Sequence, residues 1–206
     1  MSVKQQNLVG AHSEQGFSLI ETMVVVLIIM IVCAIAIFAL QPSLQSARAD
    51  TAMREILDQM RQAREYSIAN RRYVKVTFPV VAGDSEVVMT QLNAAPYGPG
   101  GANTILSTVV IAPPTQFYVF PTAPDTPDAY GDSASIVFEG TSGGPPSGMA
   151  FQSDGTLVDL ATFQPINGSV FLGVSTVRTS ARAVTVLGAT GRVRGWKGTG
   201  TYWFQF

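Results

Sequence analysis

The sequence predicts an α+β protein in which a long N-terminal α-helix, transmembrane in its first half and amphipathic in its second, packs on a C-terminal antiparallel β-sandwich-like domain. Three observations lead to this class. Residues 23–40 form an unbroken apolar run, an apolar stripe at spacings of three and four follows it, and short segments of alternating hydrophobicity begin at residue 72. These patterns are typical of a membrane helix, an amphipathic helix and β-strands, respectively.

The apolar run reads MVVVLIIMIVCAIAIFAL and contains 18 residues without a charge, a glycine or a proline. A helix over residues 17–40 would be about 36 Å long at about 1.5 Å per residue, so it would cross a hydrocarbon layer of about 30 Å. A cleaved secretory signal has a shorter apolar region and a small-residue cleavage site. We therefore expect a membrane anchor, in which Cys33 is simply a small apolar residue.

After Pro42 the helical pattern resumes and predicts an amphipathic helix to about residue 70. Charged side chains such as Arg61 and Glu65 fall elsewhere on the helical wheel, so the stripe is expected to pack on the sheet of its own domain. The apolar face of this helix is formed by Met53, Ile56, Leu57, Met60, Ala63, Ser67 and Ile68.

From residue 72 the hydrophobic period changes to two, which indicates β-strands. We expect an all-β domain of two packed antiparallel sheets, with the long helix against one of them. Nine of the twelve prolines lie between residues 93 and 148, so this stretch should be mostly loop. The predicted strands cover residues 72–78, 86–92, 104–112, 116–120, 135–139, 149–151, 156–160, 169–174, 181–187, 192–196 and 201–205.

The composition excludes several functional classes. Of the 206 residues, 47% are hydrophobic and 13% are charged, so the chain can form a core and is not wholly disordered. The single cysteine excludes an internal disulfide, and the single histidine, His12, precedes the apolar run, which leaves no zinc site or histidine-based triad in the body of one chain. Asp125, Asp128 and Asp132 could suit calcium, but a solvated loop is expected, and no metal or cofactor is predicted.

Residues 16–22, immediately before the apolar run, read GFSLIET. A polar leader that ends in glycine, then a phenylalanine, an acidic residue four positions later and a long apolar helix resemble the N-terminus of type IV pilins and of the pseudopilins of type II secretion. The resemblance implies that a membrane aspartyl prepilin peptidase cuts between Gly16 and Phe17 and then methylates the new amino group of Phe17.

The resemblance also implies a division of the chain into four parts: a leader (1–16), a transmembrane and assembly helix (17–41), an amphipathic helix that continues into the globular domain (42–71), and a β-rich periplasmic domain (72–206). The expected location is a single-pass position in the bacterial inner membrane and then in the assembled filament. Charge does not support this orientation, because the leader has only Lys4 as a base while Arg48 and Arg54 follow the helix.

Glu21 is an acid at the edge of an apolar helix, where an unpaired charge is costly. In the family, the corresponding glutamate is held to pair with the N-terminal amine of a neighbouring subunit during filament assembly. The alternatives are that Glu21 only lies at the membrane interface, or that it pairs with the amine of Phe17 on its own helix.

Two segments near the C-terminus resemble the GspH/FimT branch of the family: FQSDGT at residues 151–156, and AVTV at 183–186 followed by GRVR at 191–194. This resemblance implies a minor pilin or pseudopilin whose role is assembly and not catalysis. The implied partners are other pilins or pseudopilins, the prepilin peptidase, the inner membrane, and either DNA or secreted protein substrates. A membrane-anchored periplasmic enzyme is the remote alternative, because no catalytic arrangement surrounds either remaining lysine, Lys75 or Lys197.

Arg192 and Arg194 would project from one side of a strand, about 6.5–7 Å apart, close to the phosphate repeat of a nucleic acid strand. With Arg178, Arg182 and Lys197 they are the five bases of residues 170–206, a segment without an acid. Such a patch could bind phosphates, and nearby aromatic residues could stack on bases if exposed. In FimT-type members a G-R-x-R motif is linked to DNA capture. Alternatively, the arginines pair with the eight acids of residues 79–169, inside the domain or across a filament contact. The corresponding functional alternative is a pseudopilin H of type II secretion that binds no DNA. The aromatic candidates are Trp196, Tyr202 and Trp203.

Overall fold

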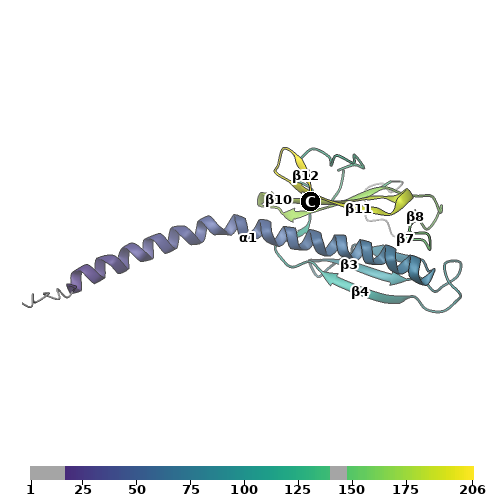
Figure 1. Ribbon diagram of the computed structural model, residues 1–206, viewed down its shortest axis with the longest axis horizontal. Coiled ribbons are helices and arrows are strands. Elements are labelled where there is room, and N and C mark those ends of the chain that lie inside the picture. The colour runs from purple at the N-terminus through teal and green to yellow at the C-terminus, as the bar shows by residue number, and fades with distance from the viewer. Residues whose placement is uncertain (1–16, 140–147) are drawn as a thin grey trace, which may run out of the picture. The chain divides into compact units, whose positions relative to one another are not determined.

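A computed structural model describes residues 17–139 and 148–206 (Figure 1). The expected leader, with His12 and the Gly16 side of the cleavage site, lies outside the described residues. The described chain is α+β, with one long N-terminal helix packed on antiparallel β-sheets, and the predicted fold class is therefore confirmed. The chain divides into two units, of which the first ends at Leu40 and the second is Gln41–Phe206.

Helix α1 (Leu19–Asn70) is continuous over 52 residues and contains Pro42. One long helix in two parts that meet near the proline was predicted here, and the single long helix is confirmed. Although a proline removes one backbone hydrogen bond from a helix interior, the flanking turns supply enough bonds for the helix to continue. The second half of α1 buries the predicted stripe except for Ile68, which is 41% exposed because it lies over the turn at Gly155, at the margin of the core.

The first sheet has the order β2-β3-β1-β7-β8, with β4 also paired to β3, and all its pairings are antiparallel. Every predicted strand in this part of the chain overlaps an observed one, whereas the two-residue strand β2 was not predicted. Its strands are β1 (Val74–Thr77), β2 (Val80–Val81), β3 (Asp84–Gln91), β4 (Thr104–Val110), β7 (Met149–Phe151) and β8 (Leu157–Asp159).

The second sheet has the order β12-β11-β10-β9-β5, with β6 also paired to β9, and it is antiparallel as well. A single turn of 3-10 helix, η1 (Gly188–Thr190), connects β10 to β11 and ends at Gly191, whose φ is 60°. The strands are β5 (Gln116–Phe117), β6 (Ile136–Phe138), β9 (Gly168–Val174), β10 (Val177–Leu187), β11 (Arg192–Gly198) and β12 (Trp203–Gln205).

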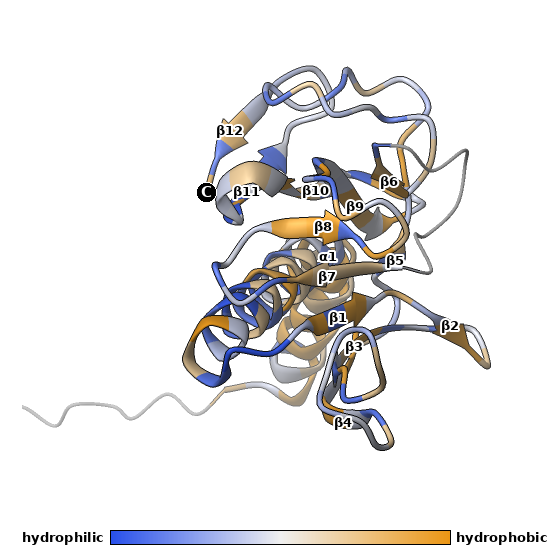
Figure 2. Cartoon of the chain, turned by 90° about the vertical axis from the view of Figure 1, so that its right-hand side faces the viewer, coloured by the Kyte–Doolittle hydropathy of each residue, from blue (hydrophilic) through white to orange (hydrophobic). Residues whose placement is uncertain are grey.

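The main hydrophobic core joins the second half of α1 to both sheets. Met53 and Leu57 lie against Gly195 of β11, while the hydroxyl of Tyr66 donates a 2.8 Å hydrogen bond to Gln91 of β3. Figure 2 shows β1 and β3 on one side of this helix and β10 and β11 on the other. The expectation that the helix contacts only one sheet was wrong, because a helix with buried residues on a broad face can fill the space between two sheets.

Candidate functional site

The N-terminal site consists of Phe17 and Glu21 on the exposed beginning of α1. Phe17 is 79% exposed and precedes the first helical residue, Leu19. Glu21 lies in the first helical turn, where its N–H donates to the carbonyl of Ser18 at 3.0 Å. An acidic side chain is favoured there by the positive end of the helix dipole. The side chain of Glu21 is exposed and is therefore accessible to a neighbouring molecule.

The apolar part of α1 has the properties of a membrane span. Its most apolar 18-residue window has a mean hydropathy of 3.4, and none of that window is buried by the rest of the protein. Among the described residues, α1 is the one helix that is long and apolar enough to cross a membrane. A contiguous apolar surface of this size is stable only when lipid or other helices cover it.

The structure places Arg182 in the interior of the globular unit. Its side chain is fully buried, its Nε donates to Asp50 of α1, and one terminal nitrogen donates to Ser46 Oγ at 2.8 Å. The other terminal nitrogen donates to the carbonyls of Thr179 and Ala181. Arg182 therefore joins α1 to β10 and has no exposed surface for contact with DNA.

Asp50 receives a second cation, because the Nζ atom of Lys197 lies 3.3 Å from its carboxylate. Burial by itself would raise the pKa of Asp50, but the hydrogen bond and the charge of Arg182, together with those of Lys197, outweigh this effect and lower the pKa below its usual value. The side chain of Lys197 is 43% exposed and remains at the surface.

Arg194 pairs with Asp128, which lies in the Pro-rich loop that precedes β6. The Nη1 atom of Arg194 lies 2.7 Å from the carboxylate, which also accepts hydrogen bonds from Thr185 Oγ1 and Trp196 Nε1. The side chain of Asp128 is only 12% exposed. The alternative that the C-terminal arginines pair with the acids of the middle segment therefore applies to Arg194.

The remaining bases of the expected patch are separated from one another. Arg178 donates to the carbonyls of Thr122 and Gly200, which ties two loops together. Arg192 is exposed, and within residues 17–139 and 148–206 its side chain has no ion-pair partner. Of the five predicted bases, Arg178 and Arg192 are thus exposed and Lys197 is half-buried, but Arg178 is bound to two carbonyls and Lys197 is paired with Asp50.

Most of the aromatic residues near these bases are buried or hydrogen-bonded inside the domain. Trp196 is 6% exposed, and the Nε1 atom of Trp203 donates to the carbonyl of Pro124 at 2.7 Å. Tyr202 is 69% exposed. Of the three aromatic residues predicted to stack on bases, only Tyr202 has the necessary free surface.

The acidic loop cluster has structural partners. Asp125 accepts hydrogen bonds from the backbone N–H groups of Thr126 and Gly131, and Asp128 is occupied as described above. In the part of the chain that the structure describes, no group of three or more His, Cys, Asp or Glu side chains is placed to hold a metal ion.

The two C-terminal segments that carry the GspH/FimT resemblance meet at one point. A Cβ atom added to Gly191 would lie 2.0 Å from the carbonyl oxygen of Gly155 and 2.8 Å from the Cδ and Nε atoms of Arg64. Both glycines have positive φ, 60° at Gly191 and 84° at Gly155. The glycine of the GRVR segment is therefore required by packing, because the close approach leaves no room for a side chain.

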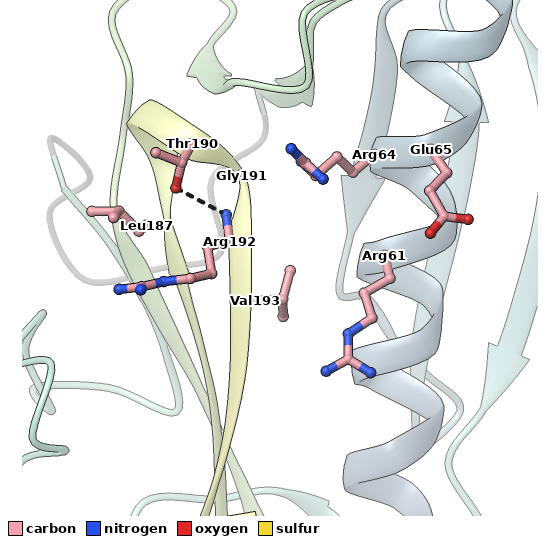
Figure 3. A pocket seen from close by; sticks show the side chains of 8 residues that line it. All are labelled: Arg61, Arg64, Glu65, Leu187, Thr190, Gly191, Arg192 and Val193. Carbon is pink, nitrogen blue, oxygen red and sulfur yellow. Dashed lines mark hydrogen bonds between the residues drawn. The ribbon is translucent and has the colours of Figure 1, made fainter.

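A cavity of about 560 Å³ opens beside this contact, between the second half of α1 and the η1–β11 turn (Figure 3). Sequence reasoning missed Arg61 and Arg64 as members of a site. The available signal was that two basic residues three positions apart share one side of a helix. The cavity is lined by Arg61, Arg64, Glu65, Leu187, Thr190, Gly191, Arg192 and Val193.

Comparison with protein families adds one finding to this geometry. Residues 11–37 match the prokaryotic N-terminal methylation motif, which spans the predicted cleavage site and most of the apolar run. No significant match is found among curated proteins or among solved structures.

The exposed apolar helix and this motif fit a membrane-anchored, single-pass protein. More specifically, the motif supports a type IV pilin-like protein that is processed by prepilin peptidase and assembles with other pilins, and it suggests a structural role and not an enzymatic one.

Proposed function

We propose that this protein is a minor pilin or pseudopilin of the GspH/FimT type. It is cleaved between Gly16 and Phe17, retained in the inner membrane by residues 17–41, and assembled through that helix into a type IV pilus or a type II secretion pseudopilus. The domain of residues 72–206 lies on the periplasmic side. The observation that carries this proposal is that the methylation motif adjoins an apolar helix with every described side chain exposed.

Assembly transfers the apolar surface of the first half of α1 from lipid into a bundle of similar helices. In that bundle the charge of Glu21 needs a cation, because an unpaired carboxylate in an apolar environment is costly. The methylated amino group of Phe17 on a neighbouring subunit supplies this cation. The position of Glu21 in the first turn of α1, with an exposed side chain, supports such a contact.

Replacement of Glu21 tests the assembly mechanism. The Glu21→Gln variant keeps the size of the side chain but cannot form the charge pair, so we expect its amount in sheared filaments to fall about tenfold or more. The measurement is an immunoblot of sheared filaments, normalised to the amount in membranes. Asp58→Asn is the matched control, because Asp58 is an exposed acid on the same helix. Equal incorporation of both variants would overturn the mechanism.

DNA binding through the C-terminal GRVR segment is the second candidate function, and the exposed and unpaired side chain of Arg192 favours it. Because Arg194 and Arg182 are engaged inside the domain, we expect Arg192→Gln to weaken binding more than Arg194→Gln does. The test is a gel shift with the full-length protein in neutral detergent micelles at two salt concentrations. Absence of salt-dependent binding would leave a pseudopilin H role, with contacts to secreted proteins or to other pseudopilins.

A further inference from the structure

The cavity between α1 and the η1–β11 turn is lined by two guanidinium groups from the same helix. Arg61 and Arg64 are three positions apart, and Figure 3 shows Arg64 extending from α1 toward the turn that carries Gly191, while Arg61 extends into the gap further along the strand, below Val193. The guanidinium of Arg192 points away from this gap, so its backbone faces the cavity while its charge lies on the other side of the strand. The two helix arginines therefore form a site that does not include the guanidinium of Arg192.

Arg64 forms no ion pair with any residue that the structure describes. Its Nε atom has almost no accessible surface and no hydrogen-bond partner among the described residues. The side chain is held in place by Gly155 and Gly191, whose backbones pack closely against it. These backbones fix the stem of Arg64, so the terminal nitrogens of its guanidinium are the donors that a ligand in the cavity could reach.

Arg61 is also free to bind a ligand. Among the described residues its ion pair is with Asp58, at 4.0 Å, and both side chains are more than half exposed, so this pair contributes little. Glu65 is the acid that lines the cavity, and Figure 3 shows its carboxylate beside the helix and not between the helix and the strand. The side of the cavity formed by α1 thus carries an excess of positive charge.

We propose that this cavity is a binding site for phosphate groups, with Arg61 and Arg64 as the ligand-binding cations. Guanidinium groups donate paired hydrogen bonds to phosphate oxygens, and two of them match the charge of a doubly charged anion. The hydroxyl of Thr190 lines the opposite wall and can donate a further bond. The volume of about 560 Å³ exceeds that of one phosphate and suits consecutive phosphates, as in pyrophosphate or a nucleic acid backbone.

The two sources of phosphate can be separated by titration of the full-length protein in neutral detergent micelles. Inorganic pyrophosphate and a short DNA duplex are the probes, and isothermal titration calorimetry at low salt is the measurement. Arg61→Gln is the informative variant because its side chain is exposed and its replacement should not disturb the fold. Arg48→Gln is the matched control, since Arg48 is an exposed base on the same helix and does not line this cavity.

We expect Arg61→Gln to weaken pyrophosphate binding about tenfold, and Arg48→Gln to leave it unchanged. Arg64→Lys keeps the charge but loses the fork of donors, so it should also weaken binding. Circular dichroism confirms that each variant is folded. If Arg61→Gln loses affinity for both pyrophosphate and the DNA duplex, DNA binds in this cavity. If it loses affinity for pyrophosphate alone, any DNA contact lies elsewhere on the protein.

Three results would overturn the proposal: no binding of pyrophosphate by the parent protein, equal binding by Arg61→Gln, or displacement of pyrophosphate by an equimolar hexaglutamate peptide. The last result would identify a site for acidic protein segments. Failure of this phosphate-site proposal can be distinguished from failure of the DNA-binding function. The pyrophosphate titration contains no DNA, and Arg192→Gln leaves both helix arginines in place.

Discussion

The two halves of α1 share one continuous backbone but differ in what surrounds them. From residue 19 to 40 every side chain is exposed and nearly all are apolar, whereas from residue 41 to 70 nine side chains are buried against the sheets. The first half shows that a helix that is apolar on all sides is surrounded by lipid or by other helices and not by water. The second half shows that hydrophobicity with a helical period signals a core on one side.

Polar contacts also distinguish the two halves. The second half is joined to β10 by Arg182, which bonds to Asp50 and Ser46 of the helix. In the first half the one ionisable side chain at the helix start is Glu21, and among the described residues it has no ion-pair partner. Variants on either side of residue 40 should therefore affect different properties of the protein.

The largest effect is expected from Asp50→Ala. This change leaves the fully buried guanidinium of Arg182 without its carboxylate, and loss of one partner of a buried pair costs about 3–5 kcal/mol. Urea unfolding in micelles, followed by tryptophan fluorescence, measures the change in the free energy of unfolding. Asp58→Ala, an exposed acid two turns further along, should change it by less than about 0.5 kcal/mol. A similar small change for both would show that the Arg182 contact does not hold the helix.

Matched truncations compare the apolar residues of the two halves directly. Ile56 is fully buried, so Ile56→Ala should lower the free energy of unfolding by about 2–5 kcal/mol. Ile29 is 54% exposed, and Ile29→Ala should leave the unfolding of the globular unit unchanged. The same urea titration checks both variants. An equal loss for Ile29→Ala would mean that the first half of α1 contributes to the stability of the domain.

Replacement of Gly191 tests how tightly the second half of α1 is packed. In Gly191→Ala the new methyl group would meet the carbonyl of Gly155 and the stem of Arg64, and the positive φ adds strain, so we expect a loss of about 1–3 kcal/mol. Gly83→Ala is the control, because Gly83 also has a positive φ but no atom near the position of the new methyl group. If both variants lose the same stability, the backbone conformation and not the packing against α1 is the cause.

The smallest effect is a dependence of stability on pH. The pKa of Asp50 is lower in the folded protein than in the unfolded chain, where it is about 3.9. The stability from this pairing is therefore fully present above about pH 4 and is lost as the pH falls through the lower, folded-state pKa. Asp50→Asn removes this contribution, so the difference in melting temperature between parent and variant should narrow on acidification. A constant difference from pH 7 to pH 3 would contradict the assignment.

Much of the fold was predictable because it depends on local periodicity. Most observed strands begin or end a few residues away from their predicted bounds, yet β7 (Met149–Phe151) has the predicted bounds. The short strand β2 and the turn η1 were missed, since two or three residues carry no measurable period. One long helix was predicted across Pro42 and is confirmed, because the surrounding helix tolerates one missing bond.

The partners of the charged residues were less accessible to prediction. Sequence proximity grouped five bases into one patch, but in the structure Arg182 and Lys197 share Asp50, while the other three have separate surroundings. The five are Arg178, Arg182, Arg192, Arg194 and Lys197. Arg182 meets an acid 132 positions away, and Arg194 meets one 66 positions away. Contacts at such separations depend on how the strands are ordered, which a single sequence does not state.

The sequence by itself determined the apolar span, the methylation motif, the amphipathic face of the helix and the α+β class, because each depends on neighbours along the chain. Only the tertiary structure decided that the helix contacts both sheets, that Arg182 and Arg194 are engaged inside the domain, and that Arg61 and Arg64 line a cavity beside Gly191. The physical reason is that burial and ion pairing are properties of the space around a side chain, and chain folding brings distant residues into that space.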